Sequence, residues 1–230
     1  MKTIGSTIIM LALASSLFAD NGKELKLASP DGTHEIVFYQ KQVSPAVNEL
    51  CYRVDYKSQP VVNESHAGLE LDNRIWEMAL GARNLKQPAC WMDNLEVDSV
   101  TYQPETDITW QPLYGERSSV RDHYRTGTLY LSKKDNSGYR LNIEVRAYNE
   151  GVAFRYFFPE HPKAIFHKVV GDLTEYALPA GTKAWTEQWA QAFFERLNID
   201  DIKHPVERAL TFELPNGKWA ALADADVDDW

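Results

Sequence analysis

Between residues 185 and 201, acidic side chains alternate with large aromatic rings. The carboxylates are Glu187, Glu195, Asp200 and Asp201, and the rings are Trp185, Trp189, Phe193 and Phe194. Clustered carboxylates are hard oxygen ligands, and a Ca²⁺ ion takes about six to eight such oxygens. Aromatic faces beside them would suit stacking against sugar rings. A solvated acidic loop explains the same residues without a ligand, so the pattern alone leaves both interpretations open.

Residues 115–124 form a second charged segment, with GER at 115–117 and DHY at 122–124. Acidic and basic side chains are interleaved here, next to a segment in which we expect a strand. Salt bridging is the expected role of such residues.

Signature motifs of the common enzyme classes are missing from the sequence. It contains no Gly-x-Ser-x-Gly elbow, Walker loop, Gly-x-Gly-x-x-Gly or His-Glu-x-x-His. Glycoside hydrolysis needs two carboxylates, but a count of 33 acidic residues selects no particular pair. The histidines are scattered and form no recognisable pair, so each is expected to be exposed or satisfied in the core. They are His34, His66, His123, His161, His167 and His204.

The clearest element around these residues is a hairpin over residues 141–158. Leu141, Ile143, Val145 and Ala147 alternate with polar residues, which predicts a half-buried strand. Asn149-Glu150-Gly151 predicts a turn, with glycine free to take a positive φ. The alternation then resumes to residue 158. Arg146 and Arg155 flank the turn, and we expect them to stabilise the domain by pairing with carboxylates.

Short strand patterns separated by turn residues recur along the chain. They lie at 25–28, 35–39, 50–56, 61–62, 68–71, 95–102, 108–113, 129–131, 174–177, 210–214 and 219–223. SPDG at 29–32 and PNG at 215–217 predict turns between them. Only residues 187–196 have a pattern that would allow a helical turn or two. This organisation predicts one all-β domain, an antiparallel sandwich.

Composition and net charge limit the classes of partner that the chain is suited to bind. The chain is 44% hydrophobic and 25% charged, as in ordinary globular proteins, with a net charge of −9. An acidic protein without a basic patch is poorly suited to nucleic acid or anionic membranes. Cys51 and Cys90 are the two cysteines, and their spacing is not that of a Cys-x-x-Cys metal motif. A disulfide between them and two buried thiols both remain open.

The first 19 residues have the pattern of a secretory signal peptide. Lys2 is followed by a short apolar run to Leu17, and Ala19 precedes Asp20. The run is too short and too rich in Ser and Ala for a membrane span, and no cysteine marks a lipid anchor. We therefore expect export to the periplasm or medium, with a mature domain over residues 20–230 and no membrane anchor.

Several segments agree, in order and spacing, with one known family. The most specific is RAYNEGVAFRY at 146–156. It is accompanied by SPDG at 29–32, GLEL at 68–71, GE at 115–116 with VRDHY at 120–124, DLTEY at 172–176, FE at 194–195 and ALADADV at 221–227. Together these segments resemble the N-terminal domain of glycoside hydrolase family 97 over nearly the whole mature chain.

The resemblance implies a β-super-sandwich similar to galactose mutarotase, followed in the family by a (β/α)₈ catalytic barrel. Family members are exported bacterial α-glucosidases and α-galactosidases that depend on Ca²⁺ and act on α-linked sugars. The barrel carries the catalytic carboxylates, whereas the N-terminal domain packs on it and lends one glutamate to the calcium site. Glu195 is the position that matches this glutamate. No catalytic residue is expected in the present chain.

The sequence departs from the family pattern at a few positions. Glu150 stands where Asp is usual, and Asp172 and Asp224 stand where Glu is commoner. Because the chain stops within the last expected strands, we expect the sandwich to be incomplete at the C-terminus and the barrel to be absent. On that interpretation this chain alone is inactive. The alternatives are a free-standing carbohydrate-binding module, a mutarotase-like epimerase, or a fragment without an independent function.

Overall fold

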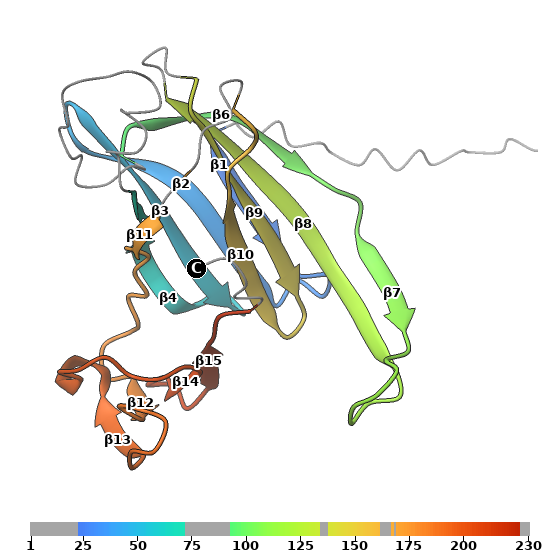
Figure 1. Ribbon diagram of the computed structural model, residues 1–230, viewed down its shortest axis with the longest axis vertical. Coiled ribbons are helices and arrows are strands. Elements are labelled where there is room, and N and C mark those ends of the chain that lie inside the picture. The colour runs from blue at the N-terminus through green and yellow to red at the C-terminus, as the bar shows by residue number, and fades with distance from the viewer. Residues whose placement is uncertain (1–22, 72–92, 134–137, 162–166, 168, 226–230) are drawn as a thin grey trace, which may run out of the picture.

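The computed structural model describes residues 23–71, 93–133, 138–161, 167 and 169–225, and almost every element in them is a strand (Figure 1). The exception is a short 3₁₀ helix, Ile199–Asp201 (η1). None of the described segments forms a helix long and apolar enough to cross a membrane. The predicted signal peptide and Cys90, and with it the disulfide question, lie outside the described residues.

The first sheet is an antiparallel meander of four strands in chain order. Its members are β1 (Glu24–Ala28), β2 (His34–Ser44), β3 (Val47–Tyr56) and β4 (Gln59–His66). Each covers a predicted strand and extends beyond it. The predicted turn between β1 and β2 is present: Gly32 has a φ of +72°, and its N–H donates to the carbonyl of Ser29 at 2.9 Å.

The second sheet has the order β10-β9-β8-β6, with β7 paired to the far part of β8. Its strands are β6 (Leu95–Tyr102), β7 (Thr106–Trp110), β8 (Val120–Lys133), β9 (Arg140–Tyr148) and β10 (Gly151–Phe157). The predicted hairpin is confirmed, with Tyr148 paired to Gly151. Gly151, however, does not have the positive φ that the sequence suggested. The two-residue loop Asn149–Glu150 makes the reversal without it.

These two sheets pack face to face and enclose the main hydrophobic core. All four predicted inward residues of β9 are fully buried. From the other sheet, Phe38 meets the Phe154 ring edge-on with centroids 5.1 Å apart. The predicted class, an all-β antiparallel sandwich, is confirmed.

Two smaller sheets complete the described part. β5 (Leu69–Leu71) pairs with β11 (Val169–Asp172), and the fourth sheet has the order β13-β12-β14-β15. We call this fourth sheet the C-terminal sheet; it comprises β12 (Lys183–Thr186), β13 (Glu195–Asn198), β14 (Leu210–Glu213) and β15 (Trp219–Leu222). It has a small core of its own, formed by Ala184, Phe212 and Leu214. Figure 1 shows it below the sandwich.

Residues 187–196, whose pattern would allow a helical turn, form none. They join β12 to β13 and begin β13, and the pairing of these two strands starts at Thr186 and Glu195. The strand predicted at residues 174–177 was wrong. There the Asp172 carboxylate accepts a hydrogen bond from the Thr174 N–H at 2.9 Å, and the Tyr52 hydroxyl donates to the carbonyl of Glu175 at 2.5 Å.

The two arginines of the hairpin behave differently. Arg155 pairs with Glu144 across the strands, its Nε donating to Oε2 at 2.7 Å, as expected. Arg146 makes no carboxylate pair within the described residues. Its guanidinium lies 4.5 Å from the centroid of the Tyr124 ring, and its Nη1 is 3.4 Å from the Tyr148 hydroxyl. A cation–π contact therefore replaces the expected ion pair at this position.

The charged segment 115–124 belongs almost entirely to a two-stranded ribbon, which we call the arm (residues 106–123). β7 and the first residues of β8 form it, beyond the point where β9 stops pairing at Tyr124. The expected salt bridges are present: Arg121 forms a bidentate pair with Asp107 at 2.7 and 2.8 Å. His123 Nε2 lies 2.7 Å from Glu105 Oε1, while its buried Nδ1 has no partner in the described residues.

Candidate functional site

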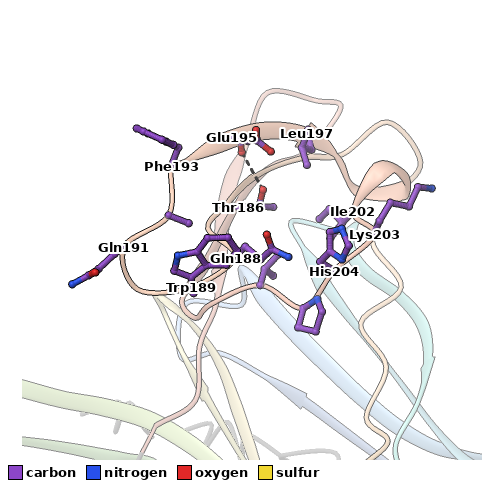
Figure 2. A pocket seen from close by; sticks show the side chains of 13 residues that line it. Thr186, Gln188, Trp189, Gln191, Phe193, Glu195, Leu197, Ile202, Lys203 and His204 are labelled. Atoms are coloured by element: carbon purple, nitrogen blue, oxygen red, sulfur yellow. Dashed lines mark hydrogen bonds between the residues drawn. The ribbon is translucent and has the colours of Figure 1, made fainter.

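An open pocket of about 280 Å³ lies on the C-terminal sheet (Figure 2). One wall comes from the ends of β12 and β13 and the loop that joins them, and the other from residues 202–206. Its lining residues are Thr186, Gln188, Trp189, Gln191, Ala192, Phe193, Glu195, Leu197, Ile202, Lys203, His204, Pro205 and Val206. Much of the segment that the sequence singled out for its carboxylates and aromatic rings therefore lines one site.

The local backbone explains this arrangement. The hydroxyl of Thr186 lies 3.3 Å from the carbonyl of Glu195, where the two strands begin to pair. A tight turn follows β12, with the Ala192 N–H donating to the carbonyl of Trp189 at 2.7 Å. The second wall is held to the first because the Glu207 N–H donates to the carbonyl of Glu187, also at 2.7 Å.

Glu195 stands at the start of β13 with an exposed side chain. Its backbone carbonyl accepts from Thr186, but its carboxylate makes no hydrogen bond or ion pair within the described residues. Other glutamates of the same fold are engaged: Glu213 pairs with Arg196 at 2.6 Å, for example. The Glu195 carboxylate is therefore available to an incoming cation or donor.

The aromatic residues of this region have two separate roles. Trp189 is 57% exposed, Phe193 93% and Phe194 69%, so three rings are open to a partner. Trp185 instead packs against Trp219 with centroids 4.4 Å apart, and the Arg196 guanidinium lies 5.0 Å from its ring. The sequence grouped Trp185 with the other three, whereas the structure uses it to build the sheet.

The acidic residues of the segment are not gathered together. Asp200 and Asp201 lie in η1, where Asp201 accepts from the Asn198 amide at 2.9 Å, and neither they nor Glu187 line the pocket. Across the described residues there is no group of three or more His, Cys, Asp or Glu positioned to hold a metal ion. The described part of the chain thus offers one candidate oxygen ligand, Glu195, rather than a complete coordination sphere.

The chemistry that this pocket can perform follows from its lining. Of the thirteen lining residues, Glu195 alone carries a carboxylate, whereas glycoside hydrolysis uses two. His204 lines the same pocket but makes no hydrogen bond with Glu195 in the described contacts. The described lining therefore does not by itself supply the two carboxylates that glycoside hydrolysis uses.

Sequence reasoning missed one wall of the pocket. Lys203, His204 and Pro205 were not associated with the acidic segment, and no spacing linked them to it. They reach the pocket because β14 pairs with β12 on the side opposite β13, so the connection between β13 and β14 must cross back over the sheet. That pairing order is a tertiary property that local patterns do not report.

Fold and surface together define an antiparallel β-sandwich domain with an appended sheet that bears an open, aromatic-rimmed pocket. Residues 27–230 match the family model described as glycosyl-hydrolase 97 N-terminal. Because the match spans most of the sequence, the chain belongs to this family of N-terminal domains, as its sequence motifs had indicated.

A curated relative is the retaining alpha-galactosidase of Bacteroides thetaiotaomicron. It is 26% identical over 178 residues, which are 77% of this chain and 22% of the relative. The chain thus spans about a fifth of the length of this enzyme.

Solved structures of similar fold include a glycoside hydrolase family 97 enzyme from Pseudoalteromonas sp. strain K8, determined in complex with panose and with acarbose. Both structures have a TM-score of 0.69 and 24% identity, and the match covers 84% of this chain and 27% of theirs. A beta-arabinopyranosidase matches with a TM-score of 0.65 and 16% identity, over 86% of this chain and 31% of its own. At these identities the likeness shows the fold.

Proposed function

We propose that this chain is the N-terminal, carbohydrate-associated domain of an exported, calcium-dependent α-glycosidase. In that enzyme it would support the active site of a (β/α)₈ catalytic barrel acting on α-linked oligosaccharides. Family membership supports this role, as does the activity named for the Bacteroides relative. The sugar complexes of the Pseudoalteromonas enzyme are consistent with it. The signal-like pattern of residues 1–19 supports export.

The observation that carries the proposal is the position of Glu195. Its exposed, unengaged carboxylate stands at a pocket rim beside three exposed aromatic rings. A carboxylate is a ligand that Ca²⁺ prefers, so the residue fits the role of one ligand. Any further carboxylate ligands would come from outside the described lining, which holds no other acidic side chain, whereas Gln188 and Gln191 offer amide oxygens in the same pocket.

A domain exchange tests this role. Residues 20–230 would replace the matching segment of the Bacteroides retaining alpha-galactosidase, and hydrolysis of a nitrophenyl α-galactoside would be followed against Ca²⁺ concentration. We expect Ca²⁺-dependent turnover, with Glu195→Gln raising the half-saturating Ca²⁺ concentration by about tenfold or more, as for loss of a charged ligand. Asp200→Asn, an acidic change outside the pocket, is the matched control.

A second readout is independent of activity. Tb³⁺ substitutes for Ca²⁺, and because Trp189 lines the same pocket as Glu195, we expect it to sensitise Tb³⁺ luminescence in the exchanged enzyme. Glu195→Gln should weaken Tb³⁺ binding whereas Asp200→Asn should not. Equal Ca²⁺ and Tb³⁺ dependence in the two variants would refute the metal role. Turnover of a nitrophenyl α-glucoside by the 230-residue chain alone would refute the assignment of catalysis to another domain.

A further inference from the structure

The outer edge of β7 is open. In the described part of the chain β7 pairs with β8 on one side and with no strand on the other. Figure 1 shows it at the margin of the molecule, with the arm extending past the end of the sandwich. An edge strand of this kind presents unpaired N–H and C=O groups that can template the addition of another strand.

The two faces of the arm differ in character. One carries the ion pairs of Asp107 with Arg121 and of Glu105 with His123. The other carries Ile108 and Trp110, which are 55% and 50% exposed. Asp122 shares this second face, opposite Ile108 in the register. The ion pairs therefore lie on one face of the ribbon, whereas the exposed apolar side chains lie on the other face with Asp122.

Two other edges of the sandwich carry features within the strand that hinder strand addition. β4 contains Pro60 and β6 has a register irregularity between Val97 and Ser99, whereas β7 has neither a proline nor a register shift between Thr106 and Trp110. Proline, charge and bulges are the usual means by which proteins protect sheet edges. The single charged residue of β7, Asp107, is neutralised by Arg121 on its own arm.

We propose that β7 is a self-association edge, pairing antiparallel with β7 of a second copy of this chain about a two-fold axis through Ile108. In that register Ile108 faces its own copy, Thr106 faces Trp110, and Asp107 faces the neutral Thr109. No like charges are directly opposed. Pro104 and Pro112 lie symmetrically about residue 108. Each proline, which has no N–H to donate, therefore lies opposite the other proline of the second copy, at the two ends of the ladder.

The physical reason for a second copy lies in the arm itself. A two-stranded ribbon is marginally stable in water, whereas three or more strands with an apolar face are stable. Pairing through β7 converts two ribbons into a four-stranded sheet, β8-β7-β7-β8, with Ile108 and Trp110 of both copies on one face. Because a two-fold axis uses the same edge twice, the contact closes as a dimer and does not propagate.

The adjoining surface argues against a sugar at this place. The Arg146 guanidinium covers the Tyr124 ring at 4.5 Å, which leaves the exposed Trp110 on this face, and that ring flanks an open strand edge. Trp, Tyr and Arg side chains are instead typical of protein–protein contacts. A second copy therefore fits this edge better than a carbohydrate.

Cysteine cross-linking tests the register directly. Opposed residues in an antiparallel pair have Cα atoms about 4.5–5.5 Å apart, within disulfide range. Ile108→Cys should therefore give a covalent dimer on a non-reducing gel that reductant reverses. Thr109→Cys, which faces Asp107 of the other copy, should give little, and the unsubstituted chain controls for Cys51 and Cys90. Equal cross-linking of both variants would overturn the register.

Sedimentation tests the association itself. The unsubstituted chain should dimerise reversibly with concentration, and Ile108→Lys should weaken dimerisation by about tenfold or more because two like charges then oppose each other. Val43→Lys, at another exposed apolar position on β2, is the matched control. A chain that stays monomeric up to about 100 µM, or a dimer equally sensitive to both lysines, would overturn the proposal. Circular dichroism would confirm that each variant is folded.

Discussion

The backbone N–H of Asp31 donates a hydrogen bond to Oδ1 of Asn149 at 3.0 Å, across 118 residues of sequence. Asp31 belongs to the turn between β1 and β2, and Asn149 to the turn between β9 and β10. The contact joins the two sheets of the sandwich at one end. Two of the motifs by which the family was identified, SPDG at 29–32 and RAYNEGVAFRY at 146–156, therefore meet at one contact between the two sheets.

Removing the Asn149 side chain should weaken this contact between the two sheets. Asn149→Ala leaves the Asp31 N–H without its partner, and we expect a loss of about 0.5–1 kcal/mol in the free energy of unfolding. Urea titration followed by circular dichroism would measure it. Glu150→Ala, in the same two-residue loop, is the control, and an equal loss in both variants would contradict a specific role for Asn149.

Asp31 should also make stability depend on pH below about 4. The Ser29 hydroxyl, followed by the Thr33 N–H, donates to its carboxylate and lowers its pKa from 3.8 to about 2. Because the folded pKa lies below the unfolded one, the stabilisation is complete above the unfolded value and is lost as the pH falls toward 2. Urea midpoints measured between pH 5 and pH 2 should therefore fall more steeply for the natural chain than for Asp31→Asn. Parallel curves would count against this assignment.

The buried hydroxyl of Tyr52 ties β3 to the DLTEY segment. It donates to the carbonyl of Glu175 at 2.5 Å, and the Tyr52 side chain is 1% exposed. Tyr52→Phe leaves this carbonyl unsatisfied and should cost about 1–2 kcal/mol in the free energy of unfolding. Tyr114→Phe, at a 90% exposed position, should change it very little. The two variants are compared by urea unfolding at neutral pH.

The C-terminal sheet should lose stability independently of the sandwich when its own core is disrupted. Phe212 is 1% exposed in its small core, so Phe212→Ala should destabilise that sheet by about 3–5 kcal/mol. Hydrogen exchange should rise in β12 and β14 while the amides of β9 keep their protection. Phe193→Ala, at a 93% exposed ring, should leave all of these rates unchanged. Uniform loss of protection would show that the two cores unfold as one.

The alternation of apolar and polar residues was sufficient to predict strands that have one face in solvent and one face in the core. The β9–β10 hairpin was predicted with its inward residues, and β6 with both of its ends. β12 and β13 were missed, because each is only four residues long and is defined by its pairing partner rather than by a pattern. For β8 the strand pattern located residues 129–131, and a strand was expected beside the charged segment 115–124 without defined bounds. Val120–Tyr124 extend the strand by pairing with β7, a contact that the local pattern does not reveal.

The candidate site was only partly accessible from sequence. The segment containing Trp189 and Glu195 was recognised by its composition, and Glu195 was selected from a family motif rather than from chemistry. No local sequence feature distinguishes Glu195 from the other acidic residues. Whether a carboxylate is free to bind a cation depends on whether the fold places an arginine beside it. The placement of His204 opposite that segment follows from the order of strands in the sheet.

β8 takes part in two structures at once. Around Leu129 it is flanked by β6 and β9 inside the core, whereas its first residues have β7 as their one described neighbour. A single continuous strand therefore passes from the most protected part of the molecule to one of the least protected. We therefore expect the arm to open locally while the sandwich stays intact, so that its amides exchange faster than those around Leu129.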